Sequence, residues 1–237
     1  MAIELRDLHK SFLVSGRTRP VLRGLNLTLR EGEITAVVGR SGCGKTTLLR
    51  ILAGLEPWDA GEIAAPAGVR MGMVFQEARL MPWLNVRANI AFSGRNGRMA
   101  PERVQELIAR VGLSGYGGAY PAQLSGGMRQ RVSLARALAY EPDWLLMDEP
   151  FSALDYFTRA DMQKELLEIQ RAERRGILLV THNLHEALFL ADQVVLLQDG
   201  RVPQACHLRI WQNPRDPVSR EAAAWKRKLL DCMEETR

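Results

Sequence analysis

The sequence predicts an α/β fold that is built on a largely parallel sheet and carries a helical subdomain between its strands. Short runs of aliphatic and β-branched residues alternate with helical patterns along most of the chain, which is typical of a parallel sheet. Residues 86–140 differ, because they show helical periodicity, a glycine-rich loop and no strand pattern. The 237 residues are 46% hydrophobic and 25% charged, so length and composition allow one substantial core.

The individual elements follow in order along the chain. The strand Ile34–Val38 ends in a glycine-rich turn, and a helix begins at Lys45 that is apolar on most sides as far as Leu55, so we expect it to be buried. Apolar residues spaced i, i+3, i+4 and i+7 from Leu184 predict an amphipathic helix against the sheet. Further strands are expected at residues 73–75, 144–147, 177–180 and 193–197, the last ending at the turn Asp199-Gly200.

The segment after about Gln204 is too short for another domain. It predicts a terminal helix that packs through one apolar face and leaves its basic residues in solvent, with a helix lying on a membrane surface as the alternative. The residues concerned are Trp225, Leu229, Cys232 and Met233 on the apolar face, with Lys226, Arg227 and Lys228 beside them.

Charge and composition exclude several classes of protein. The net charge is +5, but the charges are interspersed and aromatic residues make up only 6%, so we expect no nucleic-acid partner. The apolar runs are strand-sized, far below the roughly 20 residues that cross a bilayer, so we expect no transmembrane helix. The first residues include charges and no apolar stretch, so we expect no secretion signal. Three scattered cysteines do not predict a disulfide framework or a zinc site, so we expect a reducing cytoplasm.

A phosphate-binding loop is predicted by residues 39–46, GRSGCGKT, which fit the pattern G-x-x-x-x-G-K-[ST] between a strand and a helix. Glycines let successive backbone N–H groups turn inward around phosphate oxygens, and the following helix adds its positive end. Lys45 then places a charge on the β- and γ-phosphates of ATP, and the Thr46 hydroxyl is a ligand for Mg²⁺. A simple glycine-rich turn is the alternative. The expected ATP contacts are Gly39, Arg40, Ser41, Gly42, Cys43, Gly44, Lys45, Thr46 and Thr47.

Cys43 stands near Lys45 at the amino end of the predicted helix. Both features favour a thiolate, so we expect the pKa of this thiol to be lowered. The alternative is that any small residue serves at this position. Alkylation of Cys43 is expected to block nucleotide binding, and ATP is expected to protect the thiol.

Two adjacent acids, Asp148 and Glu149, follow the apolar strand 144–147. Because burying an unpaired charge costs several kcal/mol, a nearby cation such as Mg²⁺ is expected. Neighbouring strand residues point to opposite sides, which assigns the two acids different roles. Asp148 is the expected magnesium ligand, direct or through water, and Glu149 is the expected general base that activates water. A strand end with two solvated acids is the alternative.

Residues 124–131, LSGGMRQR, resemble the LSGGQ-type signature of ATP-binding cassette proteins, although a serine and two glycines before a helix can also be a simple cap. Four more features resemble that family in the same order. They are Phe12 as the adenine-stacking aromatic, Gln76 as the Q-loop glutamine, Ser152, Ala153, Leu154 and Asp155 as the D-loop, and His182 as the switch histidine. Phe12 or His182 alone is more often a core residue.

The resemblance implies a P-loop NTPase (RecA-like) core with an inserted all-helical signature subdomain and a small antiparallel β-subdomain. It implies one ATP-binding domain over residues 1–237, with the core at about 1–85 and 140–205, the helical subdomain at about 86–139 and a helical tail at about 206–237. Two copies then pair head to tail around two ATP molecules, with Ser125, Gly126 and Gly127 of one copy completing the site of the other. Glu149, His182 and Gln76 become catalytic, and Thr46, Gln76 and Asp148 hold Mg²⁺.

Residues 73–90 resemble the ATPases of importers for nitrate, sulfonates and taurine. The implied partners are a second copy, two transmembrane permease subunits and, indirectly, an extracytoplasmic solute-binding protein, at the cytoplasmic face of the inner membrane. Trp83 and Leu84 are either permease anchors or subdomain core. A cassette ATPase without a transport role, or one serving an unrelated solute, is the alternative, whereas a P-loop kinase or GTPase lacks the signature.

Three positions depart from the family pattern. Met128 replaces the usual signature glutamine, which removes a polar side-chain contact but no backbone donor. Asn183 follows the switch histidine where aspartate is common. Residues 201–208 lack the usual glycine-lysine turn, and the tail is too short for the regulatory domain of sugar-importer ATPases.

Overall fold

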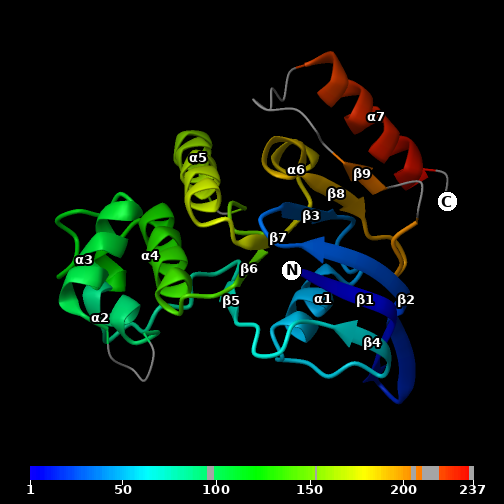
Figure 1. The fold of residues 1–237 in the computed structure, drawn as a ribbon, viewed down its shortest axis with the longest axis horizontal. Helices are drawn as coiled ribbons and strands as arrows, with labels where there is room; N and C mark the ends of the chain where they lie inside the picture. Colours follow the sequence, from blue (N-terminus) through cyan, green and yellow to red (C-terminus); the bar gives the residue numbers. More distant parts are fainter. Residues whose placement is uncertain (95–98, 153, 204–206, 210–218, 235–237) are drawn as a thin grey trace. The chain divides into compact units, whose positions relative to one another are not determined.

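The computed structural model describes residues 1–94, 99–152, 154–203, 207–209 and 219–234 (Figure 1). The chain divides into two compact units. The first unit combines residues 1–69 with residues 176–237, and the second unit is the continuous segment 70–175. Within the described residues, no helix is long and apolar enough to cross a membrane.

The first unit contains an antiparallel sheet in the order β2-β1-β4, formed by Ala2–Val14 (β1), Arg17–Arg30 (β2) and Ala60–Ala64 (β4). β1 and β2 form a long hairpin whose two-residue turn, Ser15-Gly16, has positive φ at both positions, as the strand twist requires. Alternate leucines of β2, from Leu25 to Leu29, are fully or almost fully buried. The small antiparallel sheet implied by the resemblance is therefore present.

The same unit contains parallel strands centred on β3 (Ile34–Val38), all five residues of which are buried. β3 lies between β7 (Gly176–Thr181) and β8 (Gln193–Leu196) and runs parallel to both, while β9 (His207–Arg209) pairs antiparallel with β8. Val38 is in register with Thr181 and Leu196, so the three strands end at one edge. β8 ends one residue earlier than predicted, before the turn at Asp199-Gly200.

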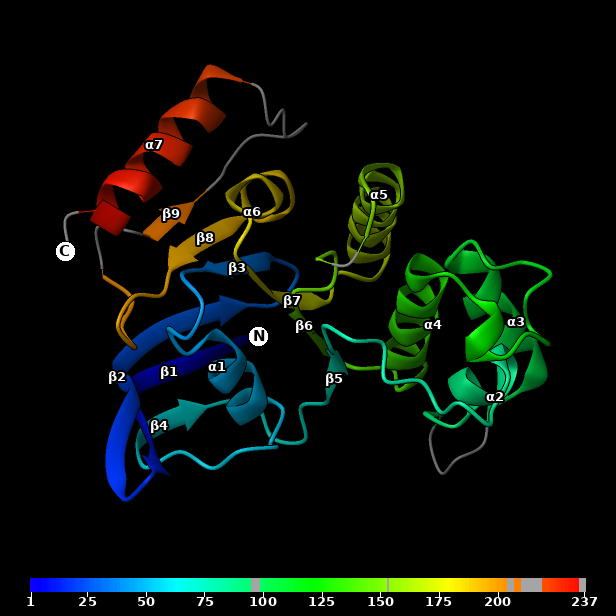
Figure 2. The same cartoon turned by 180° about the vertical axis from the view of Figure 1, so that it is seen from behind.

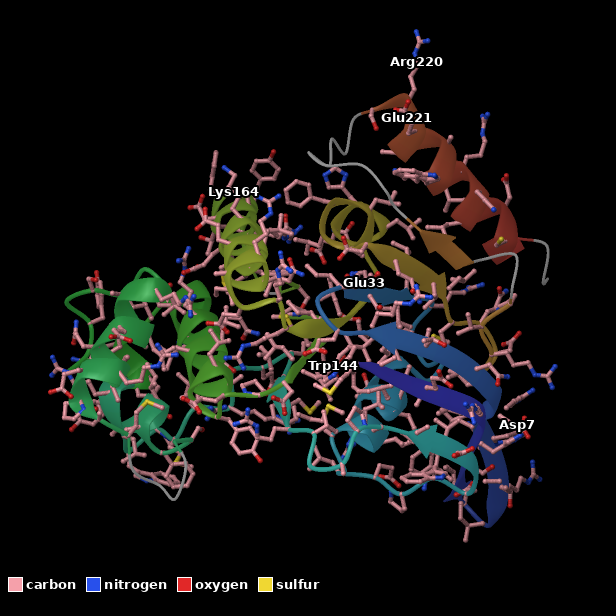
Figure 3. All side chains as sticks on the ribbon, in the orientation of Figure 1. Asp7, Glu33, Trp144, Lys164, Arg220 and Glu221 are labelled. Carbon is pink, nitrogen blue, oxygen red and sulfur yellow. The ribbon has the colours of Figure 1, made fainter. Side chains whose placement is uncertain are left out.

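The described residues of this unit form the helices α1 (Lys45–Leu52), α6 (Leu184–Leu190) and α7 (Arg220–Glu234). Figures 1 and 2 show α1 and α6 on opposite faces of the parallel strands. α1 begins where predicted but is shorter, since it stops at Leu52 and Leu55 is 54% exposed. The predicted packing of the terminal helix is confirmed, because Leu229 of α7 is fully buried while its basic residues are exposed. Arg220 points away from the start of α7 (Figure 3).

The second unit pairs β5 (Met71–Val74) in parallel with β6 (Trp144–Asp148). β5 begins and ends earlier than predicted, so Phe75 lies beyond it. The helices α2 (Val86–Ala91), α3 (Pro101–Arg110) and α4 (Gly126–Ala139) pack on one another, with α5 (Tyr156–Glu173) beside α4 and a short 3₁₀ turn at Pro121–Gln123. α4 buries Val132, Leu134, Ala135 and Leu138.

Candidate functional site

The loop between β3 and α1 wraps around one ammonium group. Lys45, the first residue of α1, is only 6% exposed, and its Nζ donates hydrogen bonds to the carbonyl oxygens of Gly39 at 2.8 Å and Arg40 at 2.9 Å. These carbonyls come from the start of the loop, six and five residues before the lysine. The residues of the sequence pattern therefore form a loop whose backbone carbonyl oxygens bind the Lys45 ammonium.

The glycines of this loop are required by its geometry. Gly44 has φ +110°, and a Cβ there would lie 3.0 to 3.1 Å from the side chains of Leu22 and Val21. A Cβ on Gly39 would collide with the carbonyl oxygen of Leu197. Gly42 also has positive φ, but a Cβ there would meet open space. Only glycine combines these backbone angles with such close packing.

The amino end of α1 suits an anion. Its N-cap residue, Gly44, supplies no capping side chain, and no acidic residue lies in the first turn of the helix. The end of a helix carries partial positive charge and backbone N–H groups that a side chain has not capped. Together with Lys45, this arrangement fits the phosphates of a nucleotide, as the sequence predicts.

The predicted lowering of the Cys43 pKa is wrong. Burial of the sulfur raises the pKa of this thiol, and the opposing effect of the Lys45 charge is smaller. The Lys45 ammonium is 4.0 Å from Sγ, but the same ammonium is already engaged by two carbonyl oxygens. The sulfur faces the inside of the loop, where a Cβ on Gly39 would lie 2.7 Å from it. Proximity to a helix end and a lysine does not offset this loss of hydration.

Two more predicted residues belong to the first unit. His182 is exposed and follows β7 directly, so the strand register places it at the same edge as the phosphate loop after Val38. Asn183 caps α6, since its Oδ1 accepts hydrogen bonds from the backbone of His185 at 3.0 Å and Glu186 at 3.4 Å. The departure from aspartate therefore retains a capping oxygen. Phe12, half-buried on β1, lies 4.9 Å from the Lys10 ammonium, measured to the ring centroid.

In the second unit the two acids differ in backbone conformation. Asp148 ends β6 and is 7% exposed, whereas Glu149 has φ +44° and leaves the strand. The argument from strand alternation is therefore wrong for Glu149, because a left-handed residue turns the chain instead of extending it.

A chain of hydrogen bonds brings Gln76 close to the turn after β6. The Nε2 of Gln76 lies 3.5 Å from Ser152 Oγ, at the long limit of a hydrogen bond, and Ser152 Oγ donates to the carbonyl oxygen of Glu149 at 2.9 Å. Val74 is in register with Met147, so Gln76 and Glu149 each stand two residues beyond this register pair. The first D-loop residue thus links the glutamine to the predicted base.

The signature segment begins α4. Ser125 is its N-cap and accepts a hydrogen bond from the backbone of Met128 at 3.2 Å, so this serine is a cap, as its sequence also allowed. The substitution at Met128 leaves that backbone donor in place. Gly126 has open space around it, whereas a Cβ on Gly127 would lie 2.6 Å from Cγ2 of Thr158 in α5.

The remaining D-loop residues lead into α5. Leu154 is buried, and Asp155 caps the helix by accepting hydrogen bonds from the backbone of Phe157 and Thr158, both at 3.1 Å. Hydrogen bonding to the side chain and backbone of Thr158 lowers the pKa of Asp155. Ala153 lies outside the described residues.

Sequence reasoning missed how the segment after β5 is held. The buried Gln130 of α4 donates from Nε2 to the Phe75 carbonyl oxygen at 3.0 Å. Arg136, also on α4, donates to the carbonyl oxygens of Arg79 at 2.8 Å and Ala78 at 2.9 Å. Long polar residues on the side of a helix rich in alanine and leucine were the available signal. They tie the Q-loop to the signature helix within one unit.

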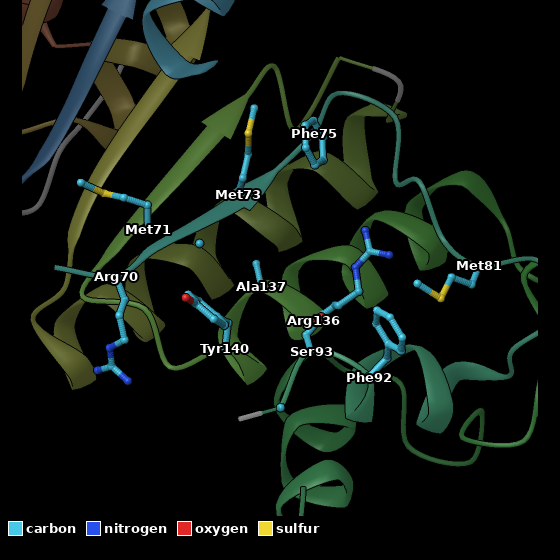
Figure 4. Close-up of a pocket in the computed structure, with 12 residues that line it drawn as sticks. Arg70, Met71, Met73, Phe75, Met81, Phe92, Ser93, Arg136, Ala137 and Tyr140 are labelled. Atoms are coloured by element: carbon cyan, nitrogen blue, oxygen red, sulfur yellow. The ribbon is translucent and has the colours of Figure 1, made fainter. Parts of the chain in front are cut away.

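A groove of about 810 Å³ opens in the second unit between β5 and the helices (Figure 4). Phe92, Arg136 and Met81 gather at one end of it, and Tyr140 and Arg70 lie toward the other. Its lining is rich in methionine and aromatic side chains, which adapt to irregular apolar partners. The sequence alone gave no indication of this groove.

Comparison with known proteins assigns the chain to a family. A family model described as ABC transporter matches residues 22–152, more than half of the chain. The chain belongs to the ABC transporter family. Curated relatives include the aliphatic sulfonates import ATP-binding protein SsuB 1 of Xanthomonas axonopodis pv. citri, 49% identical over 87% of this chain and 86% of the relative. The protein of the same name from Rhodococcus jostii is 46% identical over 91% of this chain and 88% of its own.

Solved structures agree with this assignment. An ATP-binding cassette, MJ0796, described as a dimer in a post-hydrolysis state bound to ADP and Pi, matches with a TM-score of 0.79 and 28% identity, over 89% of this chain and 99% of that one. A second dimeric structure of the same cassette matches with a TM-score of 0.79 and 27% identity. The predicted P-loop NTPase fold and the predicted function, an ATP-binding ATPase subunit of an ABC importer, are confirmed.

Proposed function

We propose that this ABC ATPase energises the uptake of aliphatic sulfonates through a separate permease, using ATP to close a dimer of two copies of the chain. The observation that carries the proposal is the phosphate loop around Lys45, present on a chain that is 44–49% identical to several proteins named as aliphatic sulfonate import ATPases. The identity covers most of each relative, so it supports assigning their solute class to this chain.

The nucleotide phosphates are bound by the loop and the first turn of α1. The backbone of residues 39–44 supplies N–H donors, Lys45 releases its two carbonyl contacts to engage phosphate oxygens, and Thr46 and Thr47 complete the helix end. Phe12 offers its ring to the adenine base. The 2.8 and 2.9 Å contacts support a role of Lys45 in phosphate binding. They show that its ammonium is oriented toward oxygen acceptors within the loop, and phosphate oxygens are acceptors of the same kind.

Magnesium is expected to be held by few protein groups. The described residues contain no group of three or more His, Cys, Asp or Glu side chains able to hold a metal ion. Thr46, Gln76 and Asp148 are the proposed protein ligands, because Mg²⁺ prefers oxygen ligands and commonly keeps waters and substrate phosphates as the others. When bound, the ion neutralises charge on the β- and γ-phosphates.

Hydrolysis is assigned to Glu149, with Gln76 and His182 as its supporting groups. Glu149 accepts a proton from the attacking water, and its backbone is fixed by the hydrogen bond from Ser152. Gln76 orients that water or the magnesium ion. His182, exposed at the strand edge that also carries the phosphate loop, stabilises the γ-phosphate charge.

The second copy of the chain completes the site. Gly126 and Gly127 and the amino end of α4 present backbone donors to the γ-phosphate bound by the partner, and the Ser125 hydroxyl, which already accepts a bond from Met128, can donate its own proton. Ser152, Ala153, Leu154 and Asp155 line the contact between copies. The dimeric form of the MJ0796 cassette supports this arrangement. Two phosphate-type sites on one chain otherwise have no common purpose.

The methionine-rich groove of the second unit is the proposed docking site for a permease helix, at the cytoplasmic face of the membrane. Trp83 is 72% exposed, and Leu84 is half-buried. This exposure excludes the core interpretation of Trp83 and leaves the docking interpretation. An extracytoplasmic binding protein then delivers the sulfonate to the permease on the other side.

Reconstitution tests this proposal directly. The chain and its co-purified permease are placed in vesicles with ATP inside and the solute-binding protein outside, and uptake of labelled ethanesulfonate, taurine and nitrate is compared. We expect ATP-dependent uptake of ethanesulfonate, abolished by Lys45→Met, which removes the charge of the phosphate loop at similar side-chain volume. Uptake of nitrate alone would refute the solute class, and uptake that survives Lys45→Met would refute the role of the loop.

A further inference from the structure

Lys10 is a buried cation on β1, where an ordinary lysine would be exposed. The residue is 6% exposed, and its Nζ forms an ion pair with Glu56 at 2.8 Å and a longer one with Asp59 at 3.7 Å. The hydrogen bond to Glu56 raises the pKa of the lysine, so it stays charged at neutral pH. Burying such a charge is costly unless it is paired, and Glu56 and Asp59 supply that pairing.

The segment that follows α1 is fixed to β1 around this lysine. Asp59 accepts a hydrogen bond from the backbone of Ser11 at 2.6 Å, and the Asp59 backbone donates to the His9 carbonyl oxygen at 2.9 Å. Residues 9–11 are therefore held on both sides of Lys10 by one short loop. These contacts tie the ammonium and its strand to the same loop.

The ammonium also lies over the ring of Phe12, 4.9 Å from its centroid. At this distance a cation is attracted by the ring electrons, and the attraction strengthens where water is excluded. One face of the ring is thus occupied by a charge that two carboxylates hold in place. The half-buried ring keeps its remaining surface for another partner.

We propose that Lys10 is a positioning residue that fixes the Phe12 ring in the orientation that stacks on the adenine base of ATP. This inference rests on the proposed role of Phe12 in nucleotide binding. A ring that is immobilised before the base arrives loses less rotational freedom on binding, so affinity for the base rises. The cation also draws electron density toward the occupied face of the ring, which favours stacking of the electron-rich purine on the other face.

The test separates binding of the base from binding of the phosphates. Dissociation constants for ATP and for tripolyphosphate, which has no base, are measured by calorimetry for the unchanged chain and for Lys10→Met, Glu56→Gln, Phe12→Ala and Lys10→Met/Phe12→Ala. Arg110→Met is the matched control, because it removes an ion pair with Glu173 in the other unit and lies outside the proposed nucleotide site.

We expect Lys10→Met to weaken ATP binding about three- to tenfold while changing tripolyphosphate binding less than about twofold. Glu56→Gln is expected to give a smaller change in the same direction, and Lys10→Met should add no further loss once Phe12 is alanine. Arg110→Met should leave the ratio of the two constants unchanged.

Each other outcome refutes the positioning role of Lys10, and one of them also refutes the adenine-binding role of Phe12. If Phe12→Ala changes the ratio and Lys10→Met does not, the proposed nucleotide site stands and the role of Lys10 is refuted. If Lys10→Met weakens both ligands equally, Lys10 supports the fold and not the ring, which also refutes the inference. If Phe12→Ala leaves the ratio unchanged, Phe12 is not the adenine platform and both statements fail.

Discussion

Adding one methyl group at Gly127 tests the structure of the signature helix. Gly126 and Gly127 are the first two residues of α4, yet their surroundings differ. A Cβ at Gly126 would have no heavy atom within 4 Å, whereas a Cβ at Gly127 would lie 2.6 Å from Thr158 Cγ2. Ordinary carbon contacts are about 3.5–4.0 Å, so the second methyl overlaps its neighbour by roughly 1 Å.

The expected size of the effect follows from two opposing terms. Overpacking of this kind costs about 1–3 kcal/mol, and replacing glycine by alanine in a helix contributes up to about 1 kcal/mol in the other direction. Gly127→Ala should therefore lower the free energy of unfolding by about 1–2 kcal/mol. Gly126→Ala should leave it unchanged or raise it slightly.

Urea unfolding measures both variants, and Thr158→Ser provides the decisive background. Serine keeps the hydroxyl but lacks Cγ2, after which the nearest side-chain carbon would be Leu154 Cδ2 at 3.6 Å. In that background Gly127→Ala should lose most of its cost, which gives a coupling free energy of about 1–2 kcal/mol. Equal effects of the two alanine substitutions, or no coupling to Thr158, would refute the reasoning.

Four further predictions concern the proposed site and the second unit. Glu149→Gln should retain ATP binding, lower turnover by about 10²–10⁴-fold and elute as an ATP-dependent dimer; near-normal turnover would remove this residue as the base. Cys43 should react with iodoacetamide more slowly than a free thiol at pH 7, with Cys43→Ser as the control, since burial raises its pKa; fast labelling would contradict that. Hydrogen bonds from Arg70 lower the pKa of Asp143, so its stabilising contribution is complete above the ordinary carboxyl pKa of about 3.9 and is lost as the pH falls below it. Asp143→Asn should make the unfolding midpoint depend less on pH below about pH 4, and an unchanged profile would exclude this carboxyl. Trp83→Ala should reduce co-purification with the permease, and full retention would show that this side chain is not an anchor.

Strands with uninterrupted apolar runs were predictable almost to the residue. The apolar run Ile34–Val38 is bounded by the charged Glu33 and by Gly39, and β3 has the same limits. β5 was placed late because it includes Gly72, whose absent side chain gives no signal. That glycine is needed, since a Cβ there would lie 2.8 Å from Pro142, which is far along the chain. Long-range packing of this kind is not visible in a local pattern.

The small antiparallel sheet of β1, β2 and β4 was expected only from family resemblance, which gave it no residue bounds. Its strands carry many charged residues, including Lys10, and the pattern slips at register shifts such as the one after Leu5. The phosphate loop, in contrast, was readable because its chemistry is local. What could not be predicted there was the balance of forces on Cys43, where burial outweighs the nearby charge.

The discontinuity of the first unit has a consequence for synthesis on the ribosome. β3 is synthesised early, but its two partner strands are synthesised much later. Ile34 pairs with Ile177 of β7, and Thr35 pairs with Gln193 of β8. The continuous segment 70–175 has by then been synthesised in full. A nascent chain halted before residue 176 therefore exposes an unpaired apolar strand, which is a site for chaperone binding. The Lys45 loop gains its neighbouring strands only when translation is nearly finished.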